Sequence, residues 1–311
     1  MMARPGLPAT TGTPPDGFKS GFVALVGRPN GGKSTLLNAA AGKKLAITSP
    51  VVQTTRQRIR AVINRPDGQL VLVDTPGLHK PKDALGRCLN QTTLLELADA
   101  DAIAFVLDAT RPLGVGDEWI LTQLKRLSAP CILVCSKAKL AQESQIKAQL
   151  QAAEQRLDFS EKIVLSVLEE SDAEVFVQAC FRLLGPGPLW FGPDQRTDQS
   201  LEVWVVELIR EQVLHTCFAE LPHAVAVQLE QLDYDAGANR YHISALIYVD
   251  RMSQKGIVVG KDGAMIKAIG SQARQEMERL LDARIFLDLR VKLRKNWRRD
   301  ENQLRRLGYG G

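Results

Sequence analysis

Nine consecutive residues near the start of the chain have the composition of a phosphate-binding loop. Residues 27 to 35 read Gly-Arg-Pro-Asn-Gly-Gly-Lys-Ser-Thr. They fit the pattern of a glycine, any four residues and Gly-Lys-Ser, in which backbone N–H groups and a helix N-terminus surround a triphosphate. In this pattern the lysine reaches the β- and γ-phosphates, and the serine hydroxyl is a ligand of Mg²⁺. The candidate nucleotide-binding residues are Gly27, Asn30, Gly31, Gly32, Lys33, Ser34 and Thr35, with Ser34 also a metal ligand.

A second motif, Asp74-Thr75-Pro76-Gly77, directly follows the apolar run 70–73. An aspartate at the end of a strand can hold Mg²⁺ through water, and a glycine lets a backbone N–H approach the γ-phosphate closely. These four residues also make a good turn, so it is the phosphate loop upstream that favours a nucleotide role for them.

The segment 48–56, between the two motifs, is polar and lacks helical periodicity, which predicts a loop. A threonine in this loop could complete the Mg²⁺ shell, so that the loop becomes ordered only with a triphosphate. A plain hydrophilic connection is the alternative interpretation.

The elements that would position these motifs form an α/β domain. Between residues 21 and 184 apolar runs alternate with helical stretches, which is typical of a parallel-dominated sheet with helices on both faces. Ligands bind such sheets at the carboxyl ends of the strands, where both motifs lie. We predict a disordered arm at 1–20 and strands at 22–26, 59–63, 70–73, 102–107, 131–135 and 163–167.

A linker at 185–199, interrupted by three prolines, separates this domain from a second one at 200–299. The second domain is predicted as helix, strand, strand, helix, helix and strand, with strands at 224–229, 243–249 and 284–293. Gly260-Lys261-Asp262-Gly263 joins its two middle helices. A Gly-x-x-Gly loop between two helices is the nucleic-acid clamp of KH domains, although such a sequence alone is usually only a turn.

The stretch 290–306 holds eight basic residues against Asp300 and Glu301, with Trp297 among them. A charge run is usually a solvated face, but beside a KH loop a phosphate-contacting stripe is favoured. Weak contact with anionic lipid is a further alternative. Residues 300–311 are predicted to form a C-terminal tail. The candidate RNA-binding residues are Gly260, Lys261, Asp262, Gly263, Lys267, Arg290, Lys292, Arg294 and Lys295.

Together with Gln53-Thr54-Thr55-Arg56, these motifs resemble those of the Era family, which are ribosome-assembly GTPases with a C-terminal KH domain. The resemblance implies a P-loop α/β domain followed by an α+β KH domain of type II. It implies GTP and GDP as ligands, Mg²⁺ as cofactor, and Lys33, Thr55 and Gly77 as catalytic residues. Thr55 would be the switch threonine and a metal ligand beside Ser34, with Asp74 acting through water. Leu78 stands where many GTPases have a water-orienting glutamine, which implies slow intrinsic hydrolysis.

The base-recognition motifs of the family are only partly present. Where the family has Asn-Lys-x-Asp, this chain has Ser136-Lys137-Ala138-Lys139, and a lysine offers only donors to the donor edge of guanine. The Ser-Ala motif is Ser166-Val167 here, and Gly31 stands where the family has valine. The residues assigned to the base are Ser136, Lys137, Lys139, Ser166 and Val167. An NTPase with relaxed base specificity, or an RNA-binding protein without turnover, is therefore the alternative to a GTPase.

The resemblance also implies the partners. These are small-subunit ribosomal RNA near its 3′ end and the small ribosomal subunit during maturation, bound by a monomer. The composition agrees with a cytoplasmic protein, because five scattered cysteines suit a reducing compartment and no apolar run approaches the roughly 20 residues of a membrane span. Peripheral contact with the cytoplasmic face of the cell membrane is a variant of this expectation.

Overall fold

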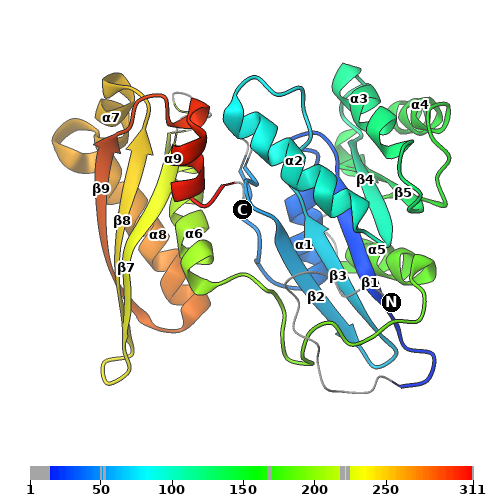
Figure 1. Ribbon diagram of the computed structural model, residues 1–311, viewed down its shortest axis with the longest axis horizontal. Coiled ribbons are helices and arrows are strands. Elements are labelled where there is room, and N and C mark those ends of the chain that lie inside the picture. The colour runs from blue at the N-terminus through cyan, green and yellow to red at the C-terminus, as the bar shows by residue number, and fades with distance from the viewer. Residues whose placement is uncertain are drawn as a thin grey trace. The chain divides into compact units, whose positions relative to one another are not determined.

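The apolar run ahead of the phosphate loop forms strand β1 (Lys19–Val26), which lies inside a six-stranded sheet in the computed structural model (Figure 1). The strand order is β2-β3-β1-β4-β5-β6, and every neighbouring pair is parallel except β2 and β3. The prediction of a parallel-dominated sheet is thus confirmed. The other strands are β2 (Ile59–Arg65), β3 (Gly68–Asp74), β4 (Ala102–Asp108), β5 (Cys131–Ser136) and β6 (Glu161–Val164).

The antiparallel pair β2–β3 departs from a sheet built only of parallel strands with helical crossovers. Arg65 pairs with Gly68, so Pro66 and Asp67 alone connect the two strands. A two-residue connection can join only antiparallel neighbours, because a parallel pair needs a crossover of a dozen or more residues.

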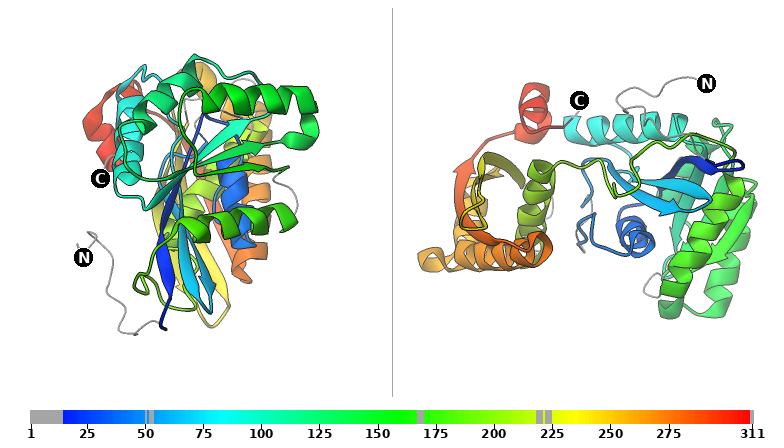
Figure 2. Two further views of the ribbon diagram at one scale, coloured as in Figure 1. Left: turned by 90° about the vertical axis from the view of Figure 1, so that its right-hand side faces the viewer. Right: turned by 90° about the horizontal axis from the view of Figure 1, so that it is seen from below.

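Helices cover both faces of this sheet, as predicted (Figure 2). Alternate side chains of β1 enter two different cores, Val23 and Leu25 on one face and Phe22, Ala24 and Val26 on the other. The first core contains residues of α1 (Lys33–Ala41) and α5 (Glu170–Leu183). The second contains residues of α2 (Ala84–Ala98), α3 (Val115–Leu124) and α4 (Glu143–Glu154). This burial on both sides explains why the strands read as continuous apolar runs.

The C-terminal part has the predicted order of helix, strand, strand, helix, helix and strand. Its sheet has the order β7-β8-β9, with an antiparallel pair β7–β8 and a parallel pair β8–β9. Residues of α6, α7 and α8 share one apolar core with the sheet, so the helices cover a single face. The elements are α6 (Leu201–Thr216), β7 (Ala226–Asp235), β8 (Arg240–Val249), α7 (Met252–Val259), α8 (Ala264–Leu281) and β9 (Arg284–Leu293).

The last residues form more structure than the predicted tail. A short 3₁₀ turn η3 (Trp297–Arg299) is followed by helix α9 (Glu301–Arg306). The Asp300 side chain accepts hydrogen bonds from the first backbone N–H groups of α9, which is an N-cap. Trp297 is fully buried, so it supports this end of the chain and does not face a nucleic acid. The basic run concealed this because the buried residues Val291, Trp297 and Leu304 are scattered among its charged ones.

The structure describes residues 15–49, 51, 54–166, 170–217, 221 and 225–309. Two units emerge from the contacts within the chain. The first comprises Met1–Ala46, Thr55–Lys80 and Leu89–Asp198, and the second comprises Ile47–Thr54, Pro81–Cys88 and Gln199–Gly311. The second unit therefore includes two short segments that precede it in sequence by more than a hundred residues. No helix among the described residues is both long enough and apolar enough to cross a membrane.

Candidate functional site

The phosphate loop connects β1 to α1, and Lys33 is the first residue of that helix. The Lys33 Nζ donates hydrogen bonds to the carbonyl oxygens of Gly27 at 3.2 Å and Arg28 at 3.1 Å. Burial lowers the pKa of Lys33, against a raising effect of nearby Asp74. The loop thus folds around the Lys33 ammonium group, at the place where this motif binds phosphate groups.

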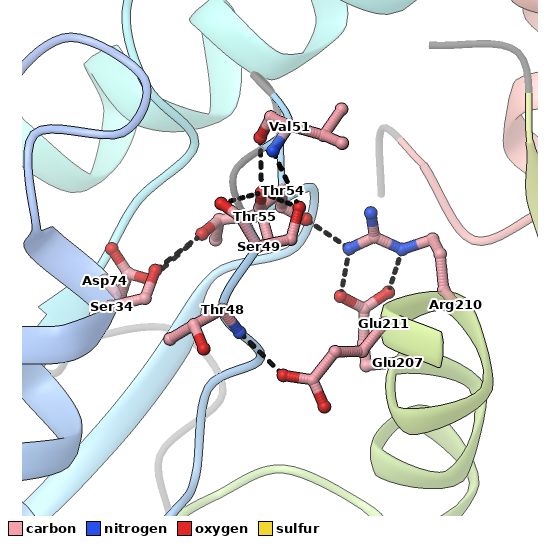
Figure 3. Close-up of polar contacts among 10 residues, drawn as sticks. All are labelled: Ser34, Thr48, Ser49, Val51, Thr54, Thr55, Asp74, Glu207, Arg210 and Glu211. Atoms are coloured by element: carbon pink, nitrogen blue, oxygen red, sulfur yellow. Dashed lines mark hydrogen bonds and ion pairs between the residues drawn. The ribbon is translucent and has the colours of Figure 1, made fainter. Parts of the chain in front are cut away.

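Side-chain oxygens of Ser34, Thr55 and Asp74 meet at one place (Figure 3), and Asp74 lies close enough to Lys33 for their charges to interact. Ser34 Oγ donates to Asp74 Oδ2 at 2.6 Å, and Thr55 Oγ1 lies 3.1 Å from the same oxygen and 3.0 Å from Ser34 Oγ. Burial raises the pKa of Asp74, an effect that Lys33, Ser34 and Thr55 oppose. Asp74 Oδ1 is buried and has no hydrogen-bond partner among the described residues. Hard oxygen donors around a partly unsatisfied carboxylate are the ligand set that Mg²⁺ prefers.

The Asp-Thr-Pro-Gly turn lies against the phosphate loop. A Cβ atom at Gly77 would lie 2.9 Å from the backbone nitrogen of Pro29, so only glycine allows this approach. Thr75 Oγ1 donates to the carbonyl of Leu25 at 2.7 Å and fixes the turn to β1. Leu78 is fully buried, and its aliphatic side chain has no group that could orient a water molecule.

Two residues that the sequence analysis did not single out hold this turn. Thr93 Oγ1 donates to the carbonyl of Pro76 at 2.9 Å, and His79 Nδ1 lies 3.0 Å from the carbonyl oxygen of Gly77. The position of His79, two residues after Gly77, could have identified it from the sequence as a residue that holds the turn. Thr93 gave none, because it lies inside α2 and is distant in sequence.

The end of β5 braces the phosphate loop from the other side. Ser136 Oγ donates a hydrogen bond to the carbonyl oxygen of Gly31 at 2.6 Å, and Lys137 Nζ donates one to the carbonyl oxygen of Asn30 at 2.7 Å. Lys137 also forms an ion pair with Asp108 at 2.6 Å. Burial alone would raise the pKa of Asp108, but hydrogen bonds from Lys137 and Thr110 and the charge of Lys137 lower it. The first two residues of the altered base motif therefore support the loop that holds the phosphates.

Of the remaining residues assigned to the base, the structure describes Lys139 and Ser166. Lys139 lies in the 3₁₀ turn η1 (Ala138–Leu140) and is exposed. Ser166 is held by Asp172, whose Oδ2 accepts from the Ser166 backbone N–H and hydroxyl, both at 2.6 Å. Val167 lies outside the described residues. The sequence analysis did not identify Asp172, because nothing in the sequence of a helical stretch distinguishes the one carboxylate that binds Ser166.

The second unit contains a groove of about 330 Å³ between α8 and β9. The preceding loop turns sharply, with Gly260 at φ +73° and Gly263 at φ +77°. A Cβ atom at Gly260 would lie 2.6 Å from the Cβ of Met265, which excludes other residues. Lys261 and Asp262 at the tip of this loop are exposed. Apolar side chains line the groove between polar ones, and its lining residues are Ile266, Lys267, Gly270, Ser271, Arg274, Leu287, Asp288 and Leu289.

This groove has the features of a clamp for single-stranded nucleic acid: a glycine loop for the backbone and an apolar floor for bases. Of its polar residues the sequence analysis named Lys267 and missed Ser271 and Arg274. Their spacing of four and seven residues from Lys267 places all three on one face of α8, and this was the available signal.

The other predicted basic residues do not line the groove. Val291 faces the apolar core, so its neighbours Arg290 and Lys292 point to the opposite face of the sheet. Arg290 forms an ion pair with Glu230 of β7, and the Arg294 guanidinium lies 4.6 Å from the ring centre of Tyr248. Lys295 lines a different cavity.

Thr48 and Thr54, which precede Thr55, contact helix α6 within the second unit (Figure 3). Ile47 is buried in the same apolar core as α6. The backbone N–H of Thr48 donates to Glu211 at 2.9 Å, and His215 Nε2 lies 2.8 Å from the Thr48 carbonyl oxygen.

A buried ion pair on α6 completes this contact. Arg210 and Glu207 are almost fully buried and are joined by two hydrogen bonds, one of them at 2.9 Å. Arg210 Nη2 also donates to the carbonyl of Thr54, the residue next to Thr55. No sequence pattern marks these partners, because α6 has the pattern of an ordinary buried helix.

Two family models match the chain in separate regions. Residues 22–137 match a model described as 50S ribosome-binding GTPase, and residues 220–298 match a model described as KH domain. The matched regions contain the phosphate loop and the groove described above.

Solved structures match nearly the whole chain. A structure of Era in complex with MgGDPNP and nucleotides 1506–1542 of 16S ribosomal RNA is 34% identical, with a TM-score of 0.90. A single-residue variant of Era from Aquifex aeolicus bound to GDP·AlF4⁻ is also 34% identical, with a TM-score of 0.89. Each match covers 94% of this chain and 100% of that chain. The order of the two folds, the motifs and this full-length similarity show that the chain belongs to the Era family of GTPases with a C-terminal KH domain.

Proposed function

We propose that this protein binds and hydrolyses GTP with Mg²⁺, binds small-subunit ribosomal RNA near its 3′ end, and acts in maturation of the small ribosomal subunit. In this proposal it is a cytoplasmic monomer. The observation that carries the nucleotide part is the meeting of Ser34, Thr55 and Asp74 beside the buried Lys33. Three separate stretches of sequence supply these oxygens, which a mere turn would not bring together.

Each of these residues would have a separate role in phosphoryl transfer. Ser34 and Thr55 would hold Mg²⁺ directly and Asp74 through water, and the ion would neutralise charge on the β- and γ-phosphates. Lys33 would stabilise the charge that develops on the transferred group, and the Gly77 N–H would bind the γ-phosphate. Because Leu78 orients no water, we expect intrinsic turnover no faster than about 10⁻³ s⁻¹, the order of unassisted small GTPases.

The RNA part of the proposal is supported by the groove between α8 and β9. Its glycine loop and apolar floor suit a single strand, and the Era relative was solved with a segment of 16S ribosomal RNA. We therefore infer that the same groove binds the 3′ region of small-subunit RNA here. Gly263→Asp would place negative charge where the RNA backbone must approach, at a position where an added Cβ meets no other atom, and RNA affinity should fall strongly.

The test of the nucleotide site is a thermal-shift series with Mg²⁺ and GTP, GDP, ATP or XTP. A ligand that binds only the native protein raises the melting temperature, by an amount equivalent to about 2.7 kcal/mol at a hundred times its Kd. Lys33→Ala should abolish the shift with GTP while the ligand-free protein still melts cooperatively. A folded Lys33→Ala variant with the wild-type shift would contradict the assignment.

A second candidate is an NTPase with relaxed base specificity. The observation in its favour is Lys139 at the place of the guanine-binding aspartate, with Ser136 already engaged by the phosphate loop. A bidentate contact to a base edge contributes roughly 1–3 kcal/mol of discrimination. Because Lys139 cannot make this contact with guanine, the preference for GTP over ATP should narrow to within about tenfold to a hundredfold in affinity. Lys139→Asp should raise that ratio in a competition titration. A ratio of several thousand in the wild type, unchanged in Lys139→Asp, would eliminate this candidate.

A further inference from the structure

We propose that Thr93 on α2 is a positioning residue of the nucleotide site and makes that site favour a nucleoside triphosphate over the diphosphate. Its hydroxyl would hold the peptide group that carries the Gly77 N–H, so that this N–H stays directed at the γ-phosphate. Thr93 acts through the peptide group and would not touch the nucleotide itself. The inference rests on the nucleotide-binding function proposed above and adds to it a residue outside the sequence motifs.

The hydrogen bond from Thr93 reaches the atom that sets the direction of this N–H. Thr93 is fully buried, and its Oγ1 lies 2.9 Å from the carbonyl oxygen of Pro76. That carbonyl and the N–H of Gly77 belong to one peptide group, whose peptide bond is trans. A trans peptide group is planar, and its C=O and N–H point in opposite directions. A hydroxyl that holds the Pro76 oxygen on the side of α2 therefore directs the Gly77 N–H away from α2.

The Gly77 N–H is a donor that calls for a ligand. Gly77 is buried, and no group of the described residues accepts a hydrogen bond from its N–H. A buried backbone N–H without a partner is rare in native proteins, because it costs about as much free energy as a lost hydrogen bond. The turn lies against the phosphate loop at Pro29, so a phosphate oxygen is the acceptor that this position favours.

A second contact from α2 holds the other end of the turn. Asn90 Nδ2 donates to the carbonyl oxygen of His79 at 2.7 Å. Asn90 and Thr93 are three residues apart in α2 and therefore lie on one face of the helix. The helix thus holds the turn on both sides of Gly77, which limits rotation of the peptide group that Thr93 contacts.

The Thr93 hydroxyl has two carbonyl oxygens within reach. Its oxygen also lies 3.0 Å from the carbonyl oxygen of Leu89, four residues earlier in α2. A hydroxyl has a single proton to donate, so the two carbonyls compete for it. A phosphate oxygen bound by the Gly77 N–H polarises that peptide group and makes the Pro76 carbonyl the stronger acceptor. The γ-phosphate and the Thr93 hydroxyl therefore reinforce each other, and a diphosphate lacks the group that would do so.

The test compares Thr93→Val with Thr93→Ser in the full chain. Valine keeps the branched shape of threonine without the hydroxyl, and serine keeps the hydroxyl. Fluorescence titration with Mg²⁺ would measure the affinities for a labelled non-hydrolysable GTP analogue and for labelled GDP. Thr93→Val should weaken binding of the GTP analogue about two- to tenfold, as expected for the loss of one hydrogen bond, and should change binding of GDP by less than about twofold. Thr93→Ser should retain the wild-type ratio of the two affinities.

The matched control is Thr122→Val on α3. Thr122 Oγ1 donates to the carbonyl oxygen of Glu118, four residues earlier, so it makes the same kind of bond along a helix. This variant should leave both affinities unchanged. If Thr93→Val does not melt cooperatively, Thr93→Ala provides the same comparison.

Two results would overturn the positioning role. One is an equal loss of GTP analogue and GDP in Thr93→Val, which would mean that the hydroxyl only stabilises the fold. The other is a loss in Thr93→Ser as large as that in Thr93→Val. If the wild type binds neither nucleotide, the proposed nucleotide-binding function fails as well. If the wild type binds both and Thr93→Val keeps their ratio, only the role of Thr93 fails.

Discussion

At the scale of single residues, we expect Asp74 to make nucleotide binding dependent on pH. Burial raises its pKa above the value in the unfolded chain, so the native protein without a cation holds that proton more tightly than an ordinary aspartate does. Since Mg²⁺ requires the carboxylate, the proton and the ion compete. We expect the Mg²⁺-dependent affinity for GTP to fall as the pH is lowered through this raised pKa, and to be nearly full above it.

Fluorescence titration with a labelled GTP between about pH 5 and pH 8, with Mg²⁺ or with EDTA, measures this competition. Asp74→Asn provides the control, because it removes the titrating group while the phosphates of the nucleotide titrate as before. The pH dependence should be larger in the wild type than in the variant. Identical slopes would show that Asp74 does not compete for the proton.

At the scale of elements, α6 depends on the buried pair Arg210–Glu207. Arg210→Ala leaves the Glu207 carboxylate without its partner and removes the donor to the Thr54 carbonyl. Such a loss destabilises a protein by about 3–5 kcal/mol. Arg274→Ala breaks an ion pair with Glu278 whose two side chains are 42% and 31% exposed, and should cost no more than about 1 kcal/mol.

Urea unfolding followed by tryptophan fluorescence compares the two variants. Arg210→Met combined with Glu207→Leu should recover most of the stability, because well-packed apolar residues often replace a buried pair without loss. If Arg210→Ala is no less stable than Arg274→Ala, the buried pair does not stabilise α6.

At the scale of the whole molecule, the second unit is built from three separate pieces of chain. Ile47 is only 1% exposed and lies in the core of that unit, and Asp83 forms an ion pair with Arg298 of the same unit. A fragment of residues 199–311 lacks both and should melt at a lower temperature than the same unit does in the full chain. In the full chain, Ile47→Ala should cost about 2–5 kcal/mol by leaving a cavity.

Differential scanning calorimetry measures the melting temperatures of the full chain, of the fragment, and of the Ile47→Ala and Val115→Ala variants of the full chain. Val115→Ala is the control for Ile47→Ala, because Val115 is 84% exposed and its truncation should change stability by no more than about 0.5 kcal/mol. A fragment that melts at the same temperature as the unit in the full chain would show that residues 47–54 and 81–88 contribute nothing to it.

Much of this protein could be predicted from short stretches of sequence. The strands before Gly27 and Asp74 are apolar runs bounded by turn residues, and the order of elements after residue 200 follows from local periodicity and glycine positions. These features depend on residues close together in the chain, so the sequence alone determined the fold class and the membership of the family.

The rest was decided by contacts between residues far apart in sequence. The sequence suggested Ser34, Thr55 and Asp74 as one set, but only the folded chain brings their oxygens within 3.1 Å. The packing of Ile47 and Thr48 on α6 and the ion pair of Asp83 with Arg298 depend on burial and hydrogen bonding across more than a hundred residues of chain. Such contacts form only when apolar faces pack and bring buried polar groups from distant parts of the chain together, and no local pattern in the sequence specifies which groups meet.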